Sequence, residues 1–141
     1  MAQLHQIEGK HFGLDHDNYI GSLEQVNQEY EEWSEFYTNN RLLALTAKAR
    51  DQELFEKKHC IWVEKLCQRL DELIPTCKPS LIHGDLWSGN LLNHASGHPV
   101  LIDPAVYYGH PEMDWAMLSL FGSYPSIAFE NYNENIAIEK G

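Results

Sequence analysis

The sequence has few basic side chains. It holds 10 Lys and Arg against 21 Asp and Glu in 141 residues, which gives a formal net charge of −11. Such an excess of negative charge repels phosphate backbones and anionic lipid surfaces. The N-terminus carries no apolar run that would serve as a signal peptide, and no stretch reaches the roughly 20 apolar residues of a membrane span. We therefore expect a soluble, cytoplasmic protein that binds neither nucleic acid nor membranes.

Cysteine is also scarce. Cys60, Cys67 and Cys77 form no C-x-x-C pair, and an odd number of thiols cannot close into a full set of disulfides. This pattern indicates a reducing compartment, with Cys60 and Cys67 as small apolar side chains within a helix. The histidines other than His83 show no H-x-H or H-E-x-x-H spacing. We expect them in loops or on the surface, and we predict no zinc site.

The chain does contain enough apolar residues for one folded domain. Hydrophobic residues make up 43% of the sequence, and about 150 residues is a typical length for a single domain. Hydrophobic periodicity and turn residues predict a mainly helical α+β protein over residues 1–141, without repeats or linkers. The expected elements are helices at 22–40, 41–50, 52–73 and 112–121, a short strand at 80–83, and a β-hairpin of 91–92 with 100–102.

Two of these helices are expected to bury an apolar face. The helix at 22–40 begins with a capping-box pattern formed by Ser22 and Gln25, and Pro75 ends the helix at 52–73. Apolar and aromatic residues recur at helical spacing in both, which predicts core packing. These stripes consist of Val26, Tyr30, Trp33, Phe36 and Tyr37 in the first helix, and of Phe55, Trp62, Leu66 and Leu73 in the second.

Polar side chains gather around the ends of the predicted short strands between residues 81 and 103. Asp85 and Asn90 lie in one loop, and Asp103 follows the predicted hairpin. An isolated Asp or Asn in a loop is usually a turn former, but three at this spacing can converge on one point. Oxygen ligands from Asn and Asp suit Mg²⁺, and a further carboxylate can accept a proton from a hydroxyl group. These are the requirements of phosphoryl transfer to an alcohol.

The order of these residues matches the catalytic loop of protein kinases. That loop reads H-R-D-x-x-x-x-N and is followed, after a strand pair, by D-F-G. Here the first block reads H-G-D-L-W-S-G-N over residues 83–90, with Gly84 in place of Arg, and the second block has Asp103 followed by Pro104. The missing Arg and Phe argue against a protein kinase switched by phosphorylation. They favour the small-molecule kinases that share the fold.

The two blocks together resemble the fructosamine kinase family, relatives of the aminoglycoside and choline kinases. The second block continues as I-D-P-A-V-Y-Y-G-H-P-E-M-D over residues 102–114, and further similarities extend over nearly the whole chain. The resemblance implies the C-terminal lobe of a protein-kinase-like fold, with a small β-hairpin carrying the catalytic loop and the metal-binding Asp. It also implies ATP-dependent phosphorylation of a sugar hydroxyl on a fructosamine or another ketosamine, that is, a sugar attached to an amine or a protein lysine.

The resemblance assigns roles to the residues of the loop and the hairpin. Asp85 would be the catalytic base. Asn90 and Asp103 would be the ligands of the Mg²⁺ that accompanies ATP. Trp87 would form one wall of the sugar site, and a Trp packed into the protein interior is the alternative.

Other residues are expected to support the loop. His83 would order it by hydrogen bonds, and Asp114 would hold its backbone, with a helix cap as the alternative role for Asp114. His110 and Glu112 are secondary site candidates.

The sequence lacks the other half of a kinase site. It contains no G-x-G-x-x-G, and Lys10 follows no strand resembling V-A-I-K. The resemblance therefore implies a helical lobe whose N-terminal nucleotide-binding lobe is absent and whose last C-terminal helices are cut. We expect little or no kinase activity from the chain alone, and self-association through apolar surface that a whole kinase covers.

Two other functions are compatible with the sequence. The chain could be a non-catalytic remnant that keeps the kinase lobe as a binding or structural module. A Mg²⁺-dependent phosphohydrolase could use the same carboxylates, but the order of the residues favours a kinase.

Overall fold

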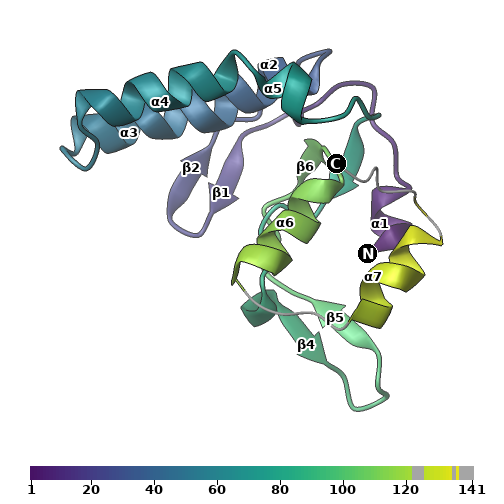
Figure 1. Cartoon of the computed structure of the whole chain (residues 1–141). Helices are drawn as coiled ribbons and strands as arrows, with labels where there is room; N and C mark the ends of the chain where they lie inside the picture. The colour runs from purple at the N-terminus through teal and green to yellow at the C-terminus, as the bar shows by residue number, and fades with distance from the viewer. Residues whose placement is uncertain (122–125, 135, 137–141) are drawn as a thin grey trace.

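The computed structural model describes residues 1–121, 126–134 and 136. These residues form three separate two-stranded antiparallel sheets combined with helices, which confirms the predicted mixed α and β composition (Figure 1). The helices are α1 (Ala2–His5), α2 (Trp33–Tyr37), the π-helix η1 (Thr38–Leu43), α3 (Ala44–Asp51), α4 (Lys57–Cys67), α5 (Leu70–Leu73), the 3₁₀ helix η2 (Ser88–Asn90), α6 (Glu112–Phe121) and α7 (Ser126–Asn133). The strands are β1 (Asn18–Ile20), β2 (Leu23–Gln25), β3 (Ser80–Ile82), β4 (Leu91–Asn93), β5 (Pro99–Leu101) and β6 (Tyr107–Gly109).

Two of the sheets frame the segment between residues 81 and 103. β3 pairs with β6, with Ile82 opposite Tyr107, so the start of the H-G-D block lies beside the strand that leads into α6. β4 and β5 form the predicted hairpin, with Leu91 opposite Leu101. The expected helix at 112–121 is present as α6. The fold therefore brings residues 83–90, the hairpin and the start of α6 together.

The first predicted helix starts later than expected. Residues 22–32 contain no helix, because β1 and β2 pair across a turn in which Gly21 has a positive φ of 56°. Gln25 does not cap a helix: its buried amide donates hydrogen bonds to Asn18 Oδ1 (2.8 Å) and to the Ala105 carbonyl oxygen (3.2 Å). Ala105 lies 80 residues away in the sequence, so the local pattern could not reveal this partner.

The helix that does form begins at Trp33 and has no break near residue 40. α2 passes through the wider turns of η1 directly into α3, so the two helices predicted at 22–40 and 41–50 form one continuous element over 33–51. Arg41 projects from η1 and donates to the Asn27 Oδ1 atom (2.7 Å) and to the Val26 carbonyl oxygen. These bonds tie the π-helix to the chain after β2.

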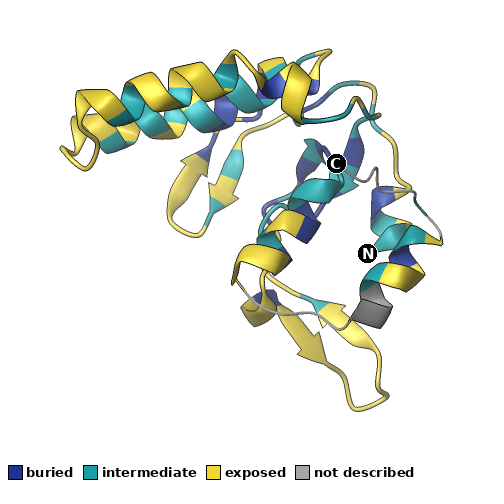
Figure 2. Ribbon diagram, viewed as in Figure 1, coloured by how far each residue is buried: buried dark blue, intermediate teal, exposed yellow. Residues whose placement is uncertain are grey.

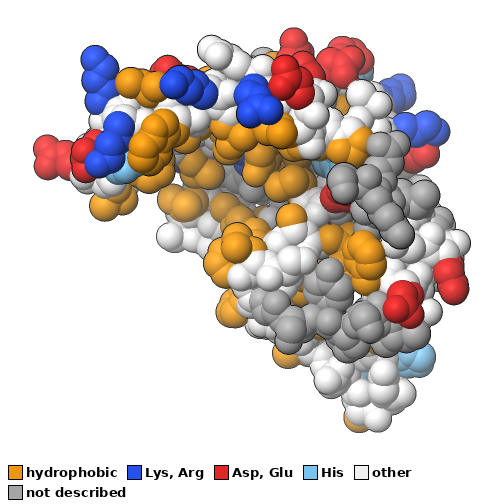
Figure 3. Space-filling view, viewed as in Figure 1, with side chains coloured by type: hydrophobic (Ala, Val, Ile, Leu, Met, Phe, Trp, Pro, Cys, Tyr) orange, Lys and Arg blue, Asp and Glu red, His pale blue; other side chains and the backbone are white. Residues whose placement is uncertain are grey.

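The helix predicted at 52–73 is shorter and divided. Glu56 and His59 form a capping box that starts α4 at Lys57, and α5 is a separate turn that ends at Leu73. α3 and α4 lie side by side as an arm, which we define as residues 44–67 (Figure 1). The expected apolar face of α4 is not core: Trp62 is 60% exposed. The arm is coloured mostly as exposed or intermediate in Figure 2, and hydrophobic side chains gather along it in Figure 3.

The core is divided between two groups of buried side chains. Trp33 and Phe36, both predicted to be buried, stack on each other with ring centroids 5.6 Å apart, whereas Val26 from the same predicted stripe is exposed. Cys60 and Cys67 are half-buried within α4. The first group consists of Phe12, Trp33, Phe36, Ile82 and Tyr107, and the second of Leu86, Trp115, Leu118 and Tyr132.

The N-terminal helix and α7 lie against the second group. α1 and α7 are neighbours in Figure 1, and Met1 and Ala2 pack on the second group of core side chains. Among the described residues, no helix has the length and apolar character needed to cross a membrane.

Candidate functional site

The site begins where β3 ends. Ile82 is fully buried, and the chain then turns through His83, Gly84 and Asp85 before η2. The Asn90 side-chain amide at the end of η2 reaches back and donates to the Asp85 backbone oxygen (2.8 Å) and to Asp85 Oδ2 (3.1 Å). Asn90 is buried and Asp85 is half-buried. The structure thus brings these two predicted site residues into direct contact.

Asp103 lies next to the residue that bonds to Asn90. The Ile102 backbone N–H donates to the Asn90 carbonyl oxygen (3.0 Å), which continues the β4–β5 pairing to the edge of the loop. Asp103 follows with a positive φ of 52° and an exposed side chain. The described residues contain no group of three or more His, Cys, Asp or Glu side chains arranged to hold a metal ion. The Asn90 amide contacts Asp85, and Asp103 follows Ile102, the residue whose backbone bonds to Asn90.

His83 connects the two sides of the loop. Its Nε2 contacts the Ile102 carbonyl oxygen at 2.9 Å, and its Nδ1 accepts a hydrogen bond from the Asp85 backbone N–H (3.3 Å). Because a carbonyl oxygen can only accept, the proton of the ring lies on Nε2 and Nδ1 is free to accept. The imidazole is buried, so it orders the loop from within the fold.

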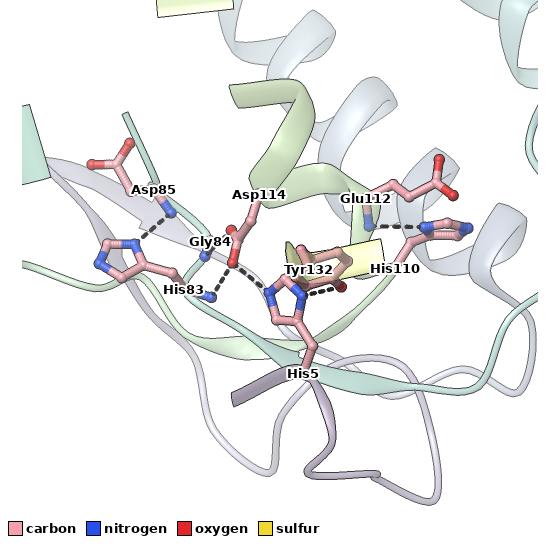
Figure 4. A network of polar contacts seen from close by, with 8 residues as sticks. All are labelled: His5, His83, Gly84, Asp85, His110, Glu112, Asp114 and Tyr132. Atoms are coloured by element: carbon pink, nitrogen blue, oxygen red, sulfur yellow. Dashed lines mark hydrogen bonds and ion pairs between the residues drawn. The ribbon is translucent and has the colours of Figure 1, made fainter. Parts of the chain in front are cut away.

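Asp114 fixes the backbone at the start of the loop. Its Oδ2 accepts from the His83 N–H (2.8 Å) and its Oδ1 from the Gly84 N–H (3.0 Å), as Figure 4 shows. The residue is only 1% exposed and lies in the first turn of α6. Both carboxylate oxygens therefore bind the loop. The alternative role as a simple helix cap does not describe these contacts.

Two residues that were not predicted to belong to the site complete this network. His5 was expected in a loop or on the surface, but it is buried, and its Nε2 lies 3.0 Å from Asp114 Oδ2. His5 Nδ1 lies 2.7 Å from the Tyr132 hydroxyl. Burial raises the pKa of Tyr132 to about 12, so the hydroxyl keeps its proton and donates to Nδ1. His5 then donates from Nε2 to Asp114.

Gly84 is required by the geometry of the loop. It has a positive φ of 80°, and a Cβ atom at this position would lie 2.2 Å from the Ala105 carbonyl oxygen. This contact explains why Arg, present at this place in the protein-kinase motif, is absent here. Glycine allows the loop to pass close to the segment that follows Asp103.

An apolar cavity lies beside Asp85. It has a volume of about 340 Å³ and is lined by Asp85, Trp87, Met117 and Phe121. The Trp87 side chain is exposed, not packed in the interior, which agrees with its predicted place at the wall of a site. The Asp85 carboxylate therefore lies at the wall of a hollow that is open to solvent.

His110 and Glu112, the secondary candidates, have a different environment. His110 accepts from the Glu112 backbone N–H at Nδ1 (3.2 Å), and its Nε2 donates to the Pro75 carbonyl oxygen (3.2 Å). Burial lowers the pKa of His110, which favours the neutral ring that these two bonds need. His110 was expected in a loop or on the surface; it lies in the loop between β6 and α6, and it is buried there. Its contacts join the start of α6 to the chain after α5.

Comparison with known proteins places this site in a family. A model of the fructosamine kinase family matches residues 1–141. The chain belongs to the fructosamine kinase family. Both sequence blocks of the site lie within the match, as do His5, Asp114 and Tyr132.

Relatives within the family are similar over most of this chain. It is 40% identical over 143 residues to the "Probable ketoamine kinase" of Lactiplantibacillus plantarum, a match that covers 100% of this chain and 51% of that protein. It is 37% identical over 123 residues to the chloroplastic protein-ribulosamine 3-kinase of Arabidopsis thaliana, covering 83% of this chain and 37% of that protein.

A crystal structure supports the same assignment. A Thermobifida fusca protein provisionally assigned as a fructosamine-3-kinase matches this fold with a TM-score of 0.93 and 38% sequence identity. The match covers 99% of this chain and 49% of that protein. The chain therefore spans about half the length of the relatives it matches.

Proposed function

We propose that this chain carries the acceptor and proton-transfer part of a kinase that phosphorylates a sugar hydroxyl of ketoamines, with ATP as the phosphoryl donor. The observation that carries this proposal is the Asp85 carboxylate, which is bonded by Asn90 and lines a cavity of about 340 Å³. Family membership supports the class of reaction. The names of the relatives, ketoamine kinase and protein-ribulosamine 3-kinase, support the class of acceptor.

The proposed step transfers one phosphoryl group and one proton. The acceptor hydroxyl oxygen forms a bond to the γ-phosphorus of ATP, the bond from that phosphorus to the bridging oxygen breaks, and ADP leaves. The hydroxyl proton passes to Asp85. Asn90 donates to Oδ2 of this carboxylate and so fixes its orientation toward the acceptor.

Asn90 and Asp103 would hold Mg²⁺. The NH₂ group of Asn90 is bonded to Asp85, which leaves the amide oxygen of Asn90 as a ligand, and the Asp103 carboxylate is exposed. Two protein ligands are sufficient, because Mg²⁺ usually keeps several waters and shares its coordination with substrate phosphates. When bound, the ion would neutralise charge on the phosphate oxygens.

The remaining predicted residues would position the acceptor and the loop. Trp87 would contact a face of the sugar from its exposed place beside the cavity. Asp114 and His83 would hold the backbone that carries Asp85, through the bonds described above. We further propose that the chain corresponds to the C-terminal lobe of a protein-kinase-like fold.

The chain alone should show little activity. Its sequence contains no glycine-rich phosphate-binding loop, and it spans about half of its relatives. The missing half of the kinase can be supplied by a fusion protein. In this fusion, the part of the L. plantarum relative that lies outside the match is joined to residues 1–141. We expect the fusion, but not the chain alone, to release ADP and to form a phosphorylated ketoamine detectable by mass spectrometry.

Free sugars and amines that lack the ketoamine linkage serve as control acceptors. ADP release with no acceptor dependence would indicate hydrolysis and contradict the kinase proposal. A correctly folded fusion that binds ATP but transfers nothing to any acceptor would support a non-catalytic binding role.

A further inference from the structure

The described residues that line the cavity beside Asp85 are this carboxylate and three large apolar side chains. Trp87 comes from the loop, whereas Met117 and Phe121 lie four residues apart and therefore on one face of α6. Met117 is half-buried and Phe121 is exposed. These three apolar side chains lie directly beside the Asp85 carboxylate, so one ligand could contact both kinds of surface.

The walls of this cavity are held in place by specific contacts. The Trp87 ring lies directly over Gly89, where a Cβ atom would come within 2.3 Å of the ring. The Ser88 hydroxyl donates to the Phe121 carbonyl oxygen (3.3 Å), which ties the loop to the end of α6. The loop wall and the helix wall are therefore connected by a hydrogen bond.

The chemistry of the lining selects a kind of ligand. Among the described lining residues, Asp85 carries the one ionisable side chain, so a second charged group would lose hydration against Trp87, Met117 and Phe121 without gaining a partner from them. A hydrocarbon group would bind there with a favourable free energy, because its apolar surface would be buried against Trp87, Met117 and Phe121.

We propose that this cavity binds an apolar substituent on the nitrogen of the ketoamine acceptor. This inference rests on the proposed function, in which Asp85 contacts the reacting hydroxyl. A ketoamine whose hydroxyl contacts Asp85 and whose sugar contacts Trp87 extends its nitrogen substituent along α6 toward Met117 and Phe121. The site then prefers ketoamines of hydrophobic amines over those whose substituent is short or charged.

Binding calorimetry with the whole 141-residue chain tests this preference. The probes are ketoamines of one sugar with methyl, butyl and hexyl groups on nitrogen, and one with a terminal carboxylate on the alkyl group. We expect affinity to rise with chain length, by up to about fourfold for each buried methylene, and to fall when the carboxylate is added.

Substitutions of the lining residues test whether the dependence of affinity on alkyl chain length comes from the cavity. Met117→Ser and Phe121→Ser should flatten the dependence on chain length, whereas Met117→Leu should keep it. Leu120→Ser is the matched control, because Leu120 lies on the same helix, is 76% exposed and does not line the cavity. Circular dichroism checks that each variant is folded.

The outcomes separate this inference from the proposed function. Affinity that is independent of chain length, or no binding of any probe, overturns the inference. If the fusion nevertheless phosphorylates ketoamines, the proposed function is supported and only the inference about the cavity is wrong. If alkylamines without a sugar bind as tightly as the matching ketoamines and no acceptor is phosphorylated, both the ketoamine assignment of the cavity and the proposed function are wrong.

Discussion

At the scale of single residues, Asp114 connects the most parts of the site. Its carboxylate receives hydrogen bonds from the His83 and Gly84 backbone and from the His5 ring, which reaches it from the N-terminal helix. All three donors meet a side chain that is almost completely buried. A buried carboxylate with three donors is stable only while every donor remains in place, because each unpaired polar group costs free energy.

Asp114→Asn should lower the free energy of unfolding by about 3 kcal/mol, because an amide places N–H donors against N–H donors inside the fold. Urea unfolding measures the change. Glu112→Gln in the same first turn of α6 is the control and should change the free energy by less than about 0.5 kcal/mol, because the hydrogen bond from Glu112 to His110 comes from the backbone N–H, which the substitution keeps. Equal losses in the two variants would contradict the role given to Asp114.

His110 should make stability depend on pH. Burial lowers its pKa in the folded protein, so the unfolded chain binds a proton more readily than the folded chain. Its contribution is present above the ordinary pKa of 6.5 and is lost as the pH falls below that value. Unfolding free energies measured at several pH values between 7.5 and 5 should fall more steeply for the native protein than for His110→Gln. Parallel curves would show that His110 does not contribute.

The residues of the site differ in how far the sequence could reveal them. Asp85 and Asn90 lie in one short block with a diagnostic spacing, so their contact could be predicted. Asp103 follows Ile102, whose backbone bonds to Asn90, and its place in the site stays a prediction. His5 and Tyr132 were missed because they lie 127 positions apart and meet only through folding. A lone histidine near the N-terminus gives no local sign that a carboxylate in α6 is its partner.

At the scale of elements, prediction succeeded where the signal is local. The β4–β5 hairpin follows from its turn-forming residues, and α6 follows from its apolar period. The prediction of a helix that begins at Ser22 was wrong, because the Gln25 amide bonds to Ala105 and Asn18. β6, which follows Asp103, was not predicted either, since its three residues form a strand only by pairing with β3.

The turn at Gly84 gives a matched test of loop geometry. Gly84 and Gly97 both have positive φ, 80° and 83°, but a Cβ atom at Gly84 would collide with the Ala105 carbonyl oxygen, whereas one at Gly97 would meet nothing within 4 Å. Gly97→Ala should lower the free energy of unfolding by about 1 kcal/mol, from backbone strain alone. Gly84→Ala should lower the free energy of unfolding by more than about 3 kcal/mol, because the loop or the backbone at Ala105 must also move to make room for the Cβ atom. Thermal unfolding compares them, and similar melting temperatures would refute this account of the loop.

At the scale of the whole molecule, the arm of residues 44–67 is open to solvent, because neither α3 nor α4 contains a buried residue. The face of α4 predicted to be core instead exposes Trp62 and Leu66, and Figure 3 shows hydrophobic side chains along the arm. The apolar period at 52–73 indicated helix, which is present there as α4 and α5 but not as one element. It could not indicate whether this chain or another surface covers that face, because periodicity does not identify the partner.

The exposed face predicts self-association of the 141-residue chain. Association buries apolar surface that a monomer leaves in water. Light scattering at increasing protein concentration should show a rising mean mass, and the double variant Trp62→Gln with Leu66→Gln should shift this rise to higher concentration. Lys65→Gln, an exposed change on the same helix, is the control. A constant monomer mass for the native chain would contradict the prediction.

The central claim is that the Asp85 carboxylate accepts the proton of a ketoamine hydroxyl during phosphoryl transfer. Its most direct test is the turnover number of Asp85→Asn in the fusion assay, with Asp15→Asn, an exposed carboxylate in the N-terminal segment, as the matched control. We predict that Asp85→Asn lowers turnover by about 10²–10⁴-fold with an unchanged fold, and that Asp15→Asn has no effect. Turnover by Asp85→Asn close to that of the unsubstituted fusion would contradict the account.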